Sequence, residues 1–263
     1  MSLHVDIAGQ GTDLVLLHGW AMHSGVFRDI ADLLSARHRV HRIDLPGHGR
    51  SGRGECMIDL QRVADAIAPH VPTDAVIVGW SLGGLVALKL AQRYTVRGLV
   101  LVSTTPRFVA DDNWTHGMAP KVFAQFFARL QPNMSATVDD FLQLQVRGDS
   151  NAATTLASLK KSLLQHPADP HALQLGLEIL RDADERTALP TIHAPALVVA
   201  GEYDRITHPN ACEYLARHLP RARYCLIRRA GHAAFISHRE QFLSEVQSFL
   251  SGIESVHEVT LDG

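Results

Sequence analysis

The sequence predicts an α/β fold in which a mostly parallel sheet is covered by helices on both faces. Short, almost continuously apolar runs of strand-forming residues alternate with segments whose apolar residues recur at i, i+3 and i+4. Strands that are apolar throughout are typical of parallel sheets buried on both sides. The alternation stops near Pro106 and resumes after Pro190, which predicts a helical insertion within one domain of 263 residues.

The first part of the chain supplies the beginning of the sheet. We expect strands at 13–19, 38–47, 74–80 and 96–104. We expect helices between them at 26–36, 57–71 and 82–94. The second strand runs into a turn that Pro46, Gly47 and Gly49 are expected to shape and Asp44 to cap.

The middle of the chain, residues 107–189, shows helical patterns and no convincing strand. Apolar spacing predicts helices at 120–130, 137–146, 152–166 and 170–182. Asp169 is expected to cap the last helix, with Pro170 at its first position. Amphipathic helices that cover the edge of such a sheet can supply an apolar wall and exclude water, so we expect these helices to form a lid.

After residue 190 the strand–helix alternation returns. Strands are predicted at 194–204 and 223–232, and helices at 211–219 and 239–252. The α/β core therefore comprises residues 1–106 and 190–252. Residues 253–263 lack a pattern and are expected to form a loosely held extension.

Composition argues against several classes of function. The formal net charge of −2 gives no overall attraction to nucleic acid or to anionic membranes, and no segment has the length of a membrane span. The three cysteines, Cys56, Cys212 and Cys225, are far apart, which favours reduced thiols in a cytoplasmic protein. The sixteen histidines show no metal-binding spacing, so we expect neither a metal nor another cofactor.

The stretch from Gly79 to Gly83 reads GWSLG and lies between a predicted strand and a predicted helix. A sharp strand-to-helix turn strains its middle residue and crowds the positions two before and two after, which both favour Gly. Such a turn lifts Ser81 Oγ above the carboxyl edge of the sheet, where the N-terminus of the next helix also points. Ser81 is therefore the candidate nucleophile.

A serine nucleophile needs a histidine base and a carboxylate that orients the base. On this type of sheet the chain order is Ser, acid, His, which selects Asp204 and His232 at the ends of later strands. Glu202 is the alternative acid. Backbone N–H groups of Leu82 and Trp20 are expected to form the oxyanion hole. Trp20 and Trp80 either flank the cleft or serve ordinary packing.

The motifs LLHGW, DLPGHGRSG, GWSLGG, GEYD and GHAAFISH together resemble those of the α/β-hydrolase superfamily, over nearly the whole chain. This resemblance implies the α/β-hydrolase fold, with an eight-stranded, mostly parallel sheet and a helical lid inserted late in the chain. Ser rather than Asp at the turn argues against dehalogenase and epoxide-hydrolase chemistry.

A closer resemblance concerns the segments LLHGWAMHSGVF, GWSLGGLVAL, FLQLQ, LKKSLL, GLEIL and FISH. They are similar to the family of pimeloyl-acyl-carrier-protein methyl ester esterases of biotin synthesis, in which a serine hydrolyses the methyl ester at the far end of a carrier-bound acyl chain. The resemblance implies the catalytic roles already given to Ser81, Asp204 and His232. It also implies a substrate-binding set of Trp20, Trp80, Ser81, Leu82, Phe141, Leu142, Gln143, Leu144, Gln145 and His232.

An acyl-carrier partner is acidic, so a docking lid should present basic residues. The candidates are Lys121, Arg129, Arg147, Lys160 and Lys161. Asp139 and Asp140 lie in the same region, however, and an ordinary solvated face explains the lysines equally well. Other readings stay open: a short-chain esterase, an enol-lactonase or a ring-cleavage-product hydrolase with the same machinery. A non-catalytic ligand receptor on this fold is a further alternative.

Overall fold

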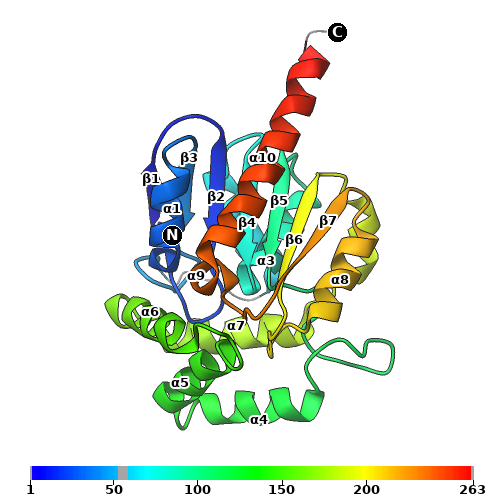
Figure 1. Cartoon of the computed structure of the whole chain (residues 1–263). Helices are drawn as coiled ribbons and strands as arrows, with labels where there is room; N and C mark the ends of the chain where they lie inside the picture. The colour runs from blue at the N-terminus through cyan, green and yellow to red at the C-terminus, as the bar shows by residue number, and fades with distance from the viewer. Residues whose placement is uncertain (1, 53–58, 262–263) are drawn as a thin grey trace.

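A computed structural model describes residues 2–52 and 59–261, with side chains placed as far as Glu254. Its seven strands form one sheet in the order β1-β3-β2-β4-β5-β6-β7 (Figure 1). Only β1 pairs antiparallel, with β3, and every other pair is parallel. The strands are β1 (Val5–Ala8), β2 (Asp13–Leu17), β3 (Arg39–Ile43), β4 (Val76–Trp80), β5 (Gly98–Val102), β6 (Ala196–Gly201) and β7 (Ala222–Ile227).

The strand count corrects one expectation, and β1 adds an element that the pattern did not predict. The resemblance implied eight strands, whereas the described residues form seven. β1 is only four residues long and lies half-buried or exposed at the edge of the sheet, so its sequence lacks the apolar run of a central strand. By contrast, β4 and β5 are buried at every position and were visible as apolar runs.

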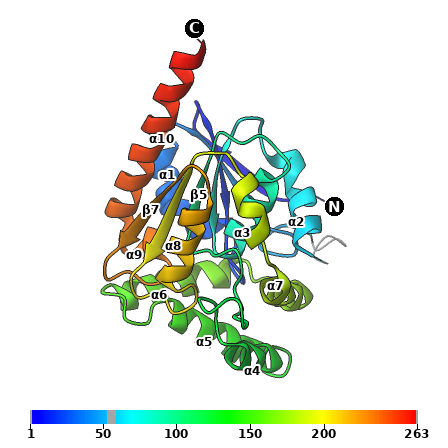
Figure 2. The same cartoon turned by 90° about the vertical axis from the view of Figure 1, so that its right-hand side faces the viewer.

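Helices cover both faces of this sheet, as the sequence predicted. α1 and α10 lie on one face and α2 and α3 on the other (Figure 2). The helices of the core are α1 (Arg28–Leu34), α2 (Leu60–Ile67), α3 (Leu82–Ala91), α8 (Pro209–His218), α9 (Ala234–Ser237) and α10 (Arg239–Leu261). Short 3-10 turns, η1 (Ser24–Phe27), η2 (Ala68–His70) and η3 (Arg186–Thr191), precede or follow them. Residues 57 and 58 of the predicted 57–71 helix, like Cys56, lie outside the described residues.

Between β5 and β6 the chain forms four helices below the carboxyl edge of the sheet (Figure 1). They are α4 (Pro120–Leu130), α5 (Met134–Gln145), α6 (Ala152–Gln165) and α7 (Pro170–Asp182), and we call residues 107–189 the helical insertion. The predicted cap of α7 is confirmed, because the Asp169 carboxylate accepts the N–H groups of His171 and Ala172. Within the described ranges, no helix is both long enough and apolar enough to cross a membrane.

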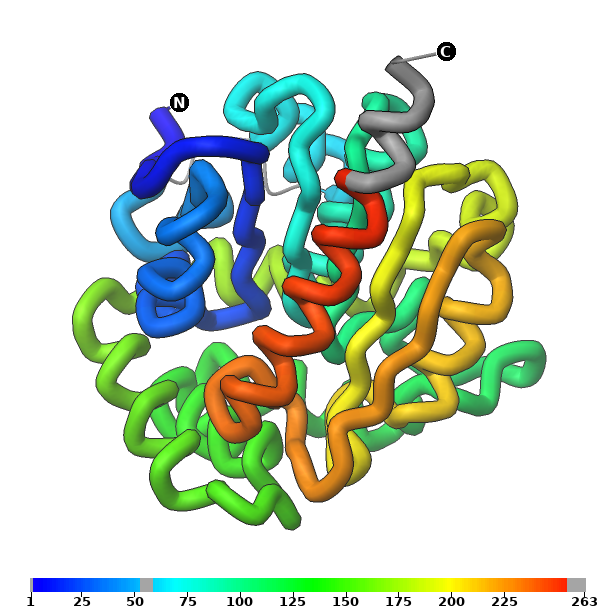
Figure 3. The backbone as a smooth tube through the Cα atoms, turned by 45° about the horizontal axis from the view of Figure 1, so that its top comes forward, coloured from blue at the N-terminus to red at the C-terminus, as the bar shows by residue number. Residues whose placement is uncertain are grey.

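The last helix is longer than the sequence predicted. α10 begins at Arg239 as expected but continues to Leu261, so residues 253–261 are helical and do not form an unpatterned extension. Two contacts hold its continuation: Ile253 packs against Gly98 of β5, and Glu254 accepts a 3.2 Å hydrogen bond from the Thr12 hydroxyl. Figure 3 shows α10 passing across the sheet, with the helical insertion at the end of the molecule away from the C-terminus.

Candidate active site

Ser81 occupies a strained turn between β4 and α3. Its backbone has φ 55° and ψ −117°, an unfavourable conformation for a residue with a side chain. A Cβ at Gly79 would lie 2.5 Å from the Gly83 carbonyl oxygen, and one at Gly83 would lie 2.1 Å from the Leu17 carbonyl oxygen. Both glycines are therefore required by close approach of the backbone, as the motif predicted.

Asp204 and His232 come together at the same edge of the sheet, after β6 and β7. His232 Nδ1 lies 2.8 Å from one carboxylate oxygen of Asp204, and both side chains are almost completely buried. The other Asp204 oxygen accepts the N–H groups of Ile206 and Thr207. Since a carboxylate only accepts, His232 Nδ1 carries the proton and Nε2 is left as an acceptor. Nε2 is buried and has no hydrogen-bond partner among the described residues.

The alternative acid, Glu202, is used differently. One of its carboxylate oxygens accepts the backbone N–H of Arg229 at 2.8 Å. Its side chain therefore serves the turn after β7, and the geometry favours Asp204 as the partner of His232.

His232 is tied to the turn that carries Ser81 through Trp80, the residue directly before the serine. The indole N–H of Trp80 donates to the His232 carbonyl at 2.9 Å, and the two rings lie 5.5 Å apart. From the other side, the His232 backbone N–H donates to the carbonyl of Gln145, the last residue of α5. The position of the imidazole is thus set jointly by the turn that carries Ser81 and by the helical insertion.

The two expected oxyanion donors have suitable surroundings. Leu82 is the first residue of α3, so its N–H has no acceptor within the helix. A Cβ at Gly19 would lie 3.2 Å from Ser81 Cβ, which places the loop carrying Trp20 against the serine. In the part of the chain that the structure describes, neither the Trp20 nor the Leu82 N–H donates a hydrogen bond. The site therefore offers two unpaired donors next to Ser81.

The indole rings of both tryptophans are buried and committed to structure. Trp20 donates from its indole N–H to the Leu173 carbonyl of α7 at 2.8 Å, and its ring packs edge-on against Phe141. Gly176 of α7 leaves room for this ring, because a Cβ there would lie 2.8 Å from it. Trp20 and Trp80 therefore pack and tether, whatever contact they also make with a substrate.

The five residues 141–145 do not act as one surface. Phe141 and Leu144 line an apolar cavity of about 70 Å³. Leu142 is fully buried, Gln145 is buried with its side-chain amide unpartnered among the described residues, and Gln143 is exposed and bonds Asp139. Further wall residues, which the sequence reasoning missed, include Phe126, Leu177 and Ile206. Phe126 could have been predicted as a wall residue, because it lies on the apolar face of the predicted 120–130 helix.

The candidate docking cations differ in whether a carboxylate already pairs with them. Lys160 pairs with Asp139 at 2.5 Å, and the neighbouring Asp140 is paired with Arg129. Arg147 and Lys161 have no carboxylate partner within the described residues. The basic character of the insertion is therefore limited to a few side chains.

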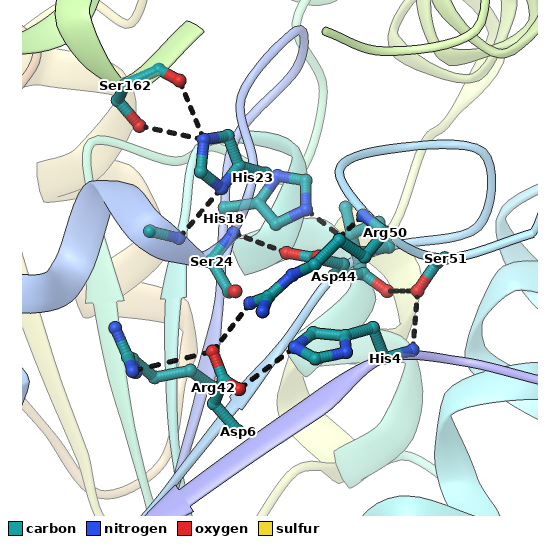
Figure 4. Close-up of polar contacts among 12 residues, drawn as sticks. His4, Asp6, His18, His23, Ser24, Arg42, Asp44, Arg50, Ser51 and Ser162 are labelled. Carbon is teal, nitrogen blue, oxygen red and sulfur yellow. Dashed lines mark hydrogen bonds and ion pairs between the residues drawn. The ribbon is translucent and has the colours of Figure 1, made fainter. Parts of the chain in front are cut away.

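A buried polar cluster behind the Trp20 loop was also missed (Figure 4). The Asp44 carboxylate accepts the N–H groups of Ser24 and Arg50, which confirms its expected role as a cap of the loop. His18, fully buried, bonds the Gly19 carbonyl and the Leu45 N–H. Burial, followed by the electrostatic effect of the neighbouring His48, lowers the pKa of His18 to about 3. The position of His18 directly before Gly19-Trp20 was the signal in the sequence.

Comparison with known proteins identifies relatives that match most of the chain. Residues 13–239 match the family model described as the alpha/beta hydrolase fold. The chain is 43% identical over 247 residues to a pimeloyl-[acyl-carrier protein] methyl ester esterase of Nitrosomonas europaea, covering 92% of this chain and 97% of that one. A protein of the same name from Stenotrophomonas maltophilia is 40% identical, with 95% and 97% covered. Among solved structures, an esterase from Exiguobacterium antarcticum superposes with a TM-score of 0.85 at 22% identity, covering 96% and 95% of the two chains.

Proposed function

The chain belongs to the α/β-hydrolase fold family and, within it, to the pimeloyl-[acyl-carrier protein] methyl ester esterases, and we propose that it hydrolyses this methyl ester as a serine carboxylesterase. The products are methanol and the carrier-bound free acid, which enters biotin synthesis. The observation that carries the proposal is the buried Asp204–His232 pair at the edge of the sheet where the strained turn presents Ser81.

In the first half-reaction Ser81 Oγ attacks the ester carbonyl while His232 Nε2 takes its proton. The developing oxyanion is held by the Trp20 and Leu82 N–H groups, which donate to no other group among the residues that the structure describes. Collapse of this tetrahedral intermediate breaks the bond to the methoxy group, which leaves as methanol with the proton from His232. Asp204 keeps the imidazole in the required tautomer throughout.

In the second half-reaction His232 takes a proton from water, and the resulting hydroxide attacks the acyl-enzyme. The intermediate releases Ser81, which regains its proton, and the acid departs as a carboxylate. The apolar cavity lined by Phe141 and Leu144 suits the methylene chain of the ester, and the helical insertion acts as its lid. The charged product fits this apolar wall less well, which favours release.

We place the carrier protein on the helical insertion, where Arg147 and Lys161 remain available for acidic side chains. The low number of such cations predicts weak, salt-sensitive docking. The widely spaced cysteines and the carrier-bound substrate are consistent with a cytoplasmic reaction.

The test compares hydrolysis of a carrier-bound pimeloyl methyl ester with hydrolysis of short p-nitrophenyl esters. We expect a clearly higher kcat/KM for the carrier-bound ester, and equal efficiency would contradict the assigned substrate. Ser81→Ala should lose several orders of magnitude in kcat with an unchanged fold. Ser103→Ala is the matched control, because Ser103 is also buried, also has a positive φ and also follows a sheet strand.

A further inference from the structure

His18 has both ring nitrogens committed to backbone groups on either side of it. Nδ1 lies 2.8 Å from the Gly19 carbonyl oxygen, and Nε2 lies 2.9 Å from the Leu45 amide nitrogen. A carbonyl only accepts and an amide N–H only donates, so Nδ1 carries the proton and Nε2 is bare. The ring is therefore neutral and confined to one tautomer.

The carbonyl of Gly19 and the N–H of Trp20 belong to the same planar peptide group. A hydrogen bond to the carbonyl fixes the plane of that peptide from behind and polarises its N–H. The Met22 N–H also donates to the Gly19 oxygen, at 3.3 Å, so this carbonyl accepts two bonds. The N–H on the opposite side of the same peptide has no acceptor among the described residues, and Gly19, which begins this peptide, lies against Ser81.

We propose that His18 is a positioning residue, which aims and polarises the Trp20 N–H as an oxyanion donor through the Gly19 carbonyl. The inference rests on the proposed function, because it takes the Trp20 N–H as one of the two donors. It assigns no proton transfer to His18, since neither ring nitrogen is available to a substrate. Asp44 completes the arrangement by fixing the loop that presents Leu45, through the N–H groups of Ser24 and Arg50.

The surroundings of the His18 ring keep it uncharged throughout the pH range in which an esterase is assayed. His18 is fully buried, and its ring lies 5.3 Å from that of His48, so a proton on His18 is disfavoured by burial and by its neighbour. Asp44 and His23 also face this cluster, the first favouring and the second opposing protonation. The pKa of about 3 leaves the hydrogen bond to Gly19 intact throughout the range in which an esterase is assayed.

Two substitutions separate positioning from packing. In His18→Asn the amide nitrogen can replace Nδ1 and donate to Gly19, while the bond to Leu45 is lost. In His18→Gln the longer side chain can replace Nε2 and accept from Leu45, while the donor to Gly19 is lost. Each variant keeps one of the two hydrogen bonds, so a purely structural role affects both alike.

The assay uses p-nitrophenyl acetate, which needs no carrier, and a boronic acid that forms a tetrahedral anion on Ser81. For His18→Gln we expect kcat to fall by about tenfold to a hundredfold, part of the effect of removing one oxyanion donor, with KM nearly unchanged. Boronate affinity should fall by the same factor. His18→Asn should retain kcat and boronate affinity to within about threefold, because one donor to Gly19 is preserved.

Equal kcat in the two variants, or a loss of kcat without loss of boronate affinity, overturns the inference. Imidazole ¹⁵N NMR of the wild-type chain gives a test that needs no variant: His18 should show the Nδ1–H tautomer and no titration between pH 5 and 8, and any other result is contradictory. An active Ser81→Ala variant instead refutes the proposed function. If Ser81→Ala is inactive and the two His18 variants have equal kcat, only the role of His18 is refuted.

Discussion

The indole N–H of Trp80 donates a 2.9 Å hydrogen bond to the backbone carbonyl of His232. Trp80 directly precedes Ser81, so one side chain connects the turn of the proposed nucleophile to the loop of the proposed base. The ring also packs edge-on against Phe235 of α9, at a centroid distance of 5.0 Å. Trp80, the second residue of the GWSLG motif, therefore helps to hold His232 in place.

Trp80→Phe should lower kcat by about tenfold or less, because the His232 loop loses a tether but keeps its bond to Asp204. It should also lower the free energy of unfolding by about 1–3 kcal/mol, since a buried carbonyl loses its partner. Trp114→Phe is the matched control: its buried indole donates to the Arg107 carbonyl, outside the proposed site. Steady-state kinetics and urea unfolding should show similar destabilisation in both variants and a loss of kcat only in Trp80→Phe.

Asp204→Asn should lower kcat by about four orders of magnitude, because an amide can donate to His232 Nδ1 and stabilise the wrong tautomer. Glu202→Gln is the control, since Glu202 lies two residues away and bonds only the Arg229 N–H. It should retain nearly full activity. A comparable loss of kcat in both variants would show that the acid has been misassigned.

Gly83→Ala should destabilise the fold by at least about 2 kcal/mol, because its Cβ would lie 2.1 Å from the Leu17 carbonyl oxygen, a backbone atom that cannot move alone. Gly252→Ala meets no atom within 4 Å and lies in α10. It should be neutral or stabilise by up to about 1 kcal/mol through helix propensity. Thermal unfolding of the two variants measures the difference, and equal melting temperatures contradict the crowding argument.

Stability should fall as the pH falls from about 7 to 5. Burial is the main cause that lowers the pKa values of His18, His23 and His48 in the fold. An unfolded histidine has a pKa of about 6.5, so below that pH the unfolded chain binds more protons and is stabilised relative to the native state. This contribution to stability is complete above the unfolded pKa. His48→Phe should flatten the dependence of melting temperature on pH, and an unchanged slope would exclude His48 as a contributor.

The sequence predicted those parts of the fold that are determined locally. β4, Ser81 and α3 follow from an apolar run, two glycines and a second apolar run, and the contacts at Gly79 and Gly83 show why those residue types are needed. Edge strand β1 carries no such pattern, because its four residues are only half-buried or exposed. The end of α10 was missed because Ile253 and Glu254 gain their partners only in the folded chain.

The candidate site could be proposed from the sequence as a set of side chains, but its supporting network of hydrogen bonds could not. Chain order after successive strands was enough to select Ser81, Asp204 and His232. The supporting bonds join distant segments: Trp20 reaches Leu173 and Trp80 reaches His232. Spacing along the chain does not encode such contacts.

Leu144→Phe should shift the preference for acyl chains toward shorter ones. Leu144 and Phe141 line the apolar cavity of about 70 Å³, so a larger side chain at position 144 reduces the volume left for methylene groups. The ratio of kcat/KM for octanoyl to that for acetyl p-nitrophenyl esters measures the effect and should fall by about tenfold, which corresponds to one or two methylenes expelled from an apolar wall. Gln143→Ala is the control, because Gln143 is exposed and bonds Asp139. If the ratio stays constant in Leu144→Phe, the acyl chain binds elsewhere. A larger side chain in the wall of an occupied cavity should lower kcat/KM for the longer ester.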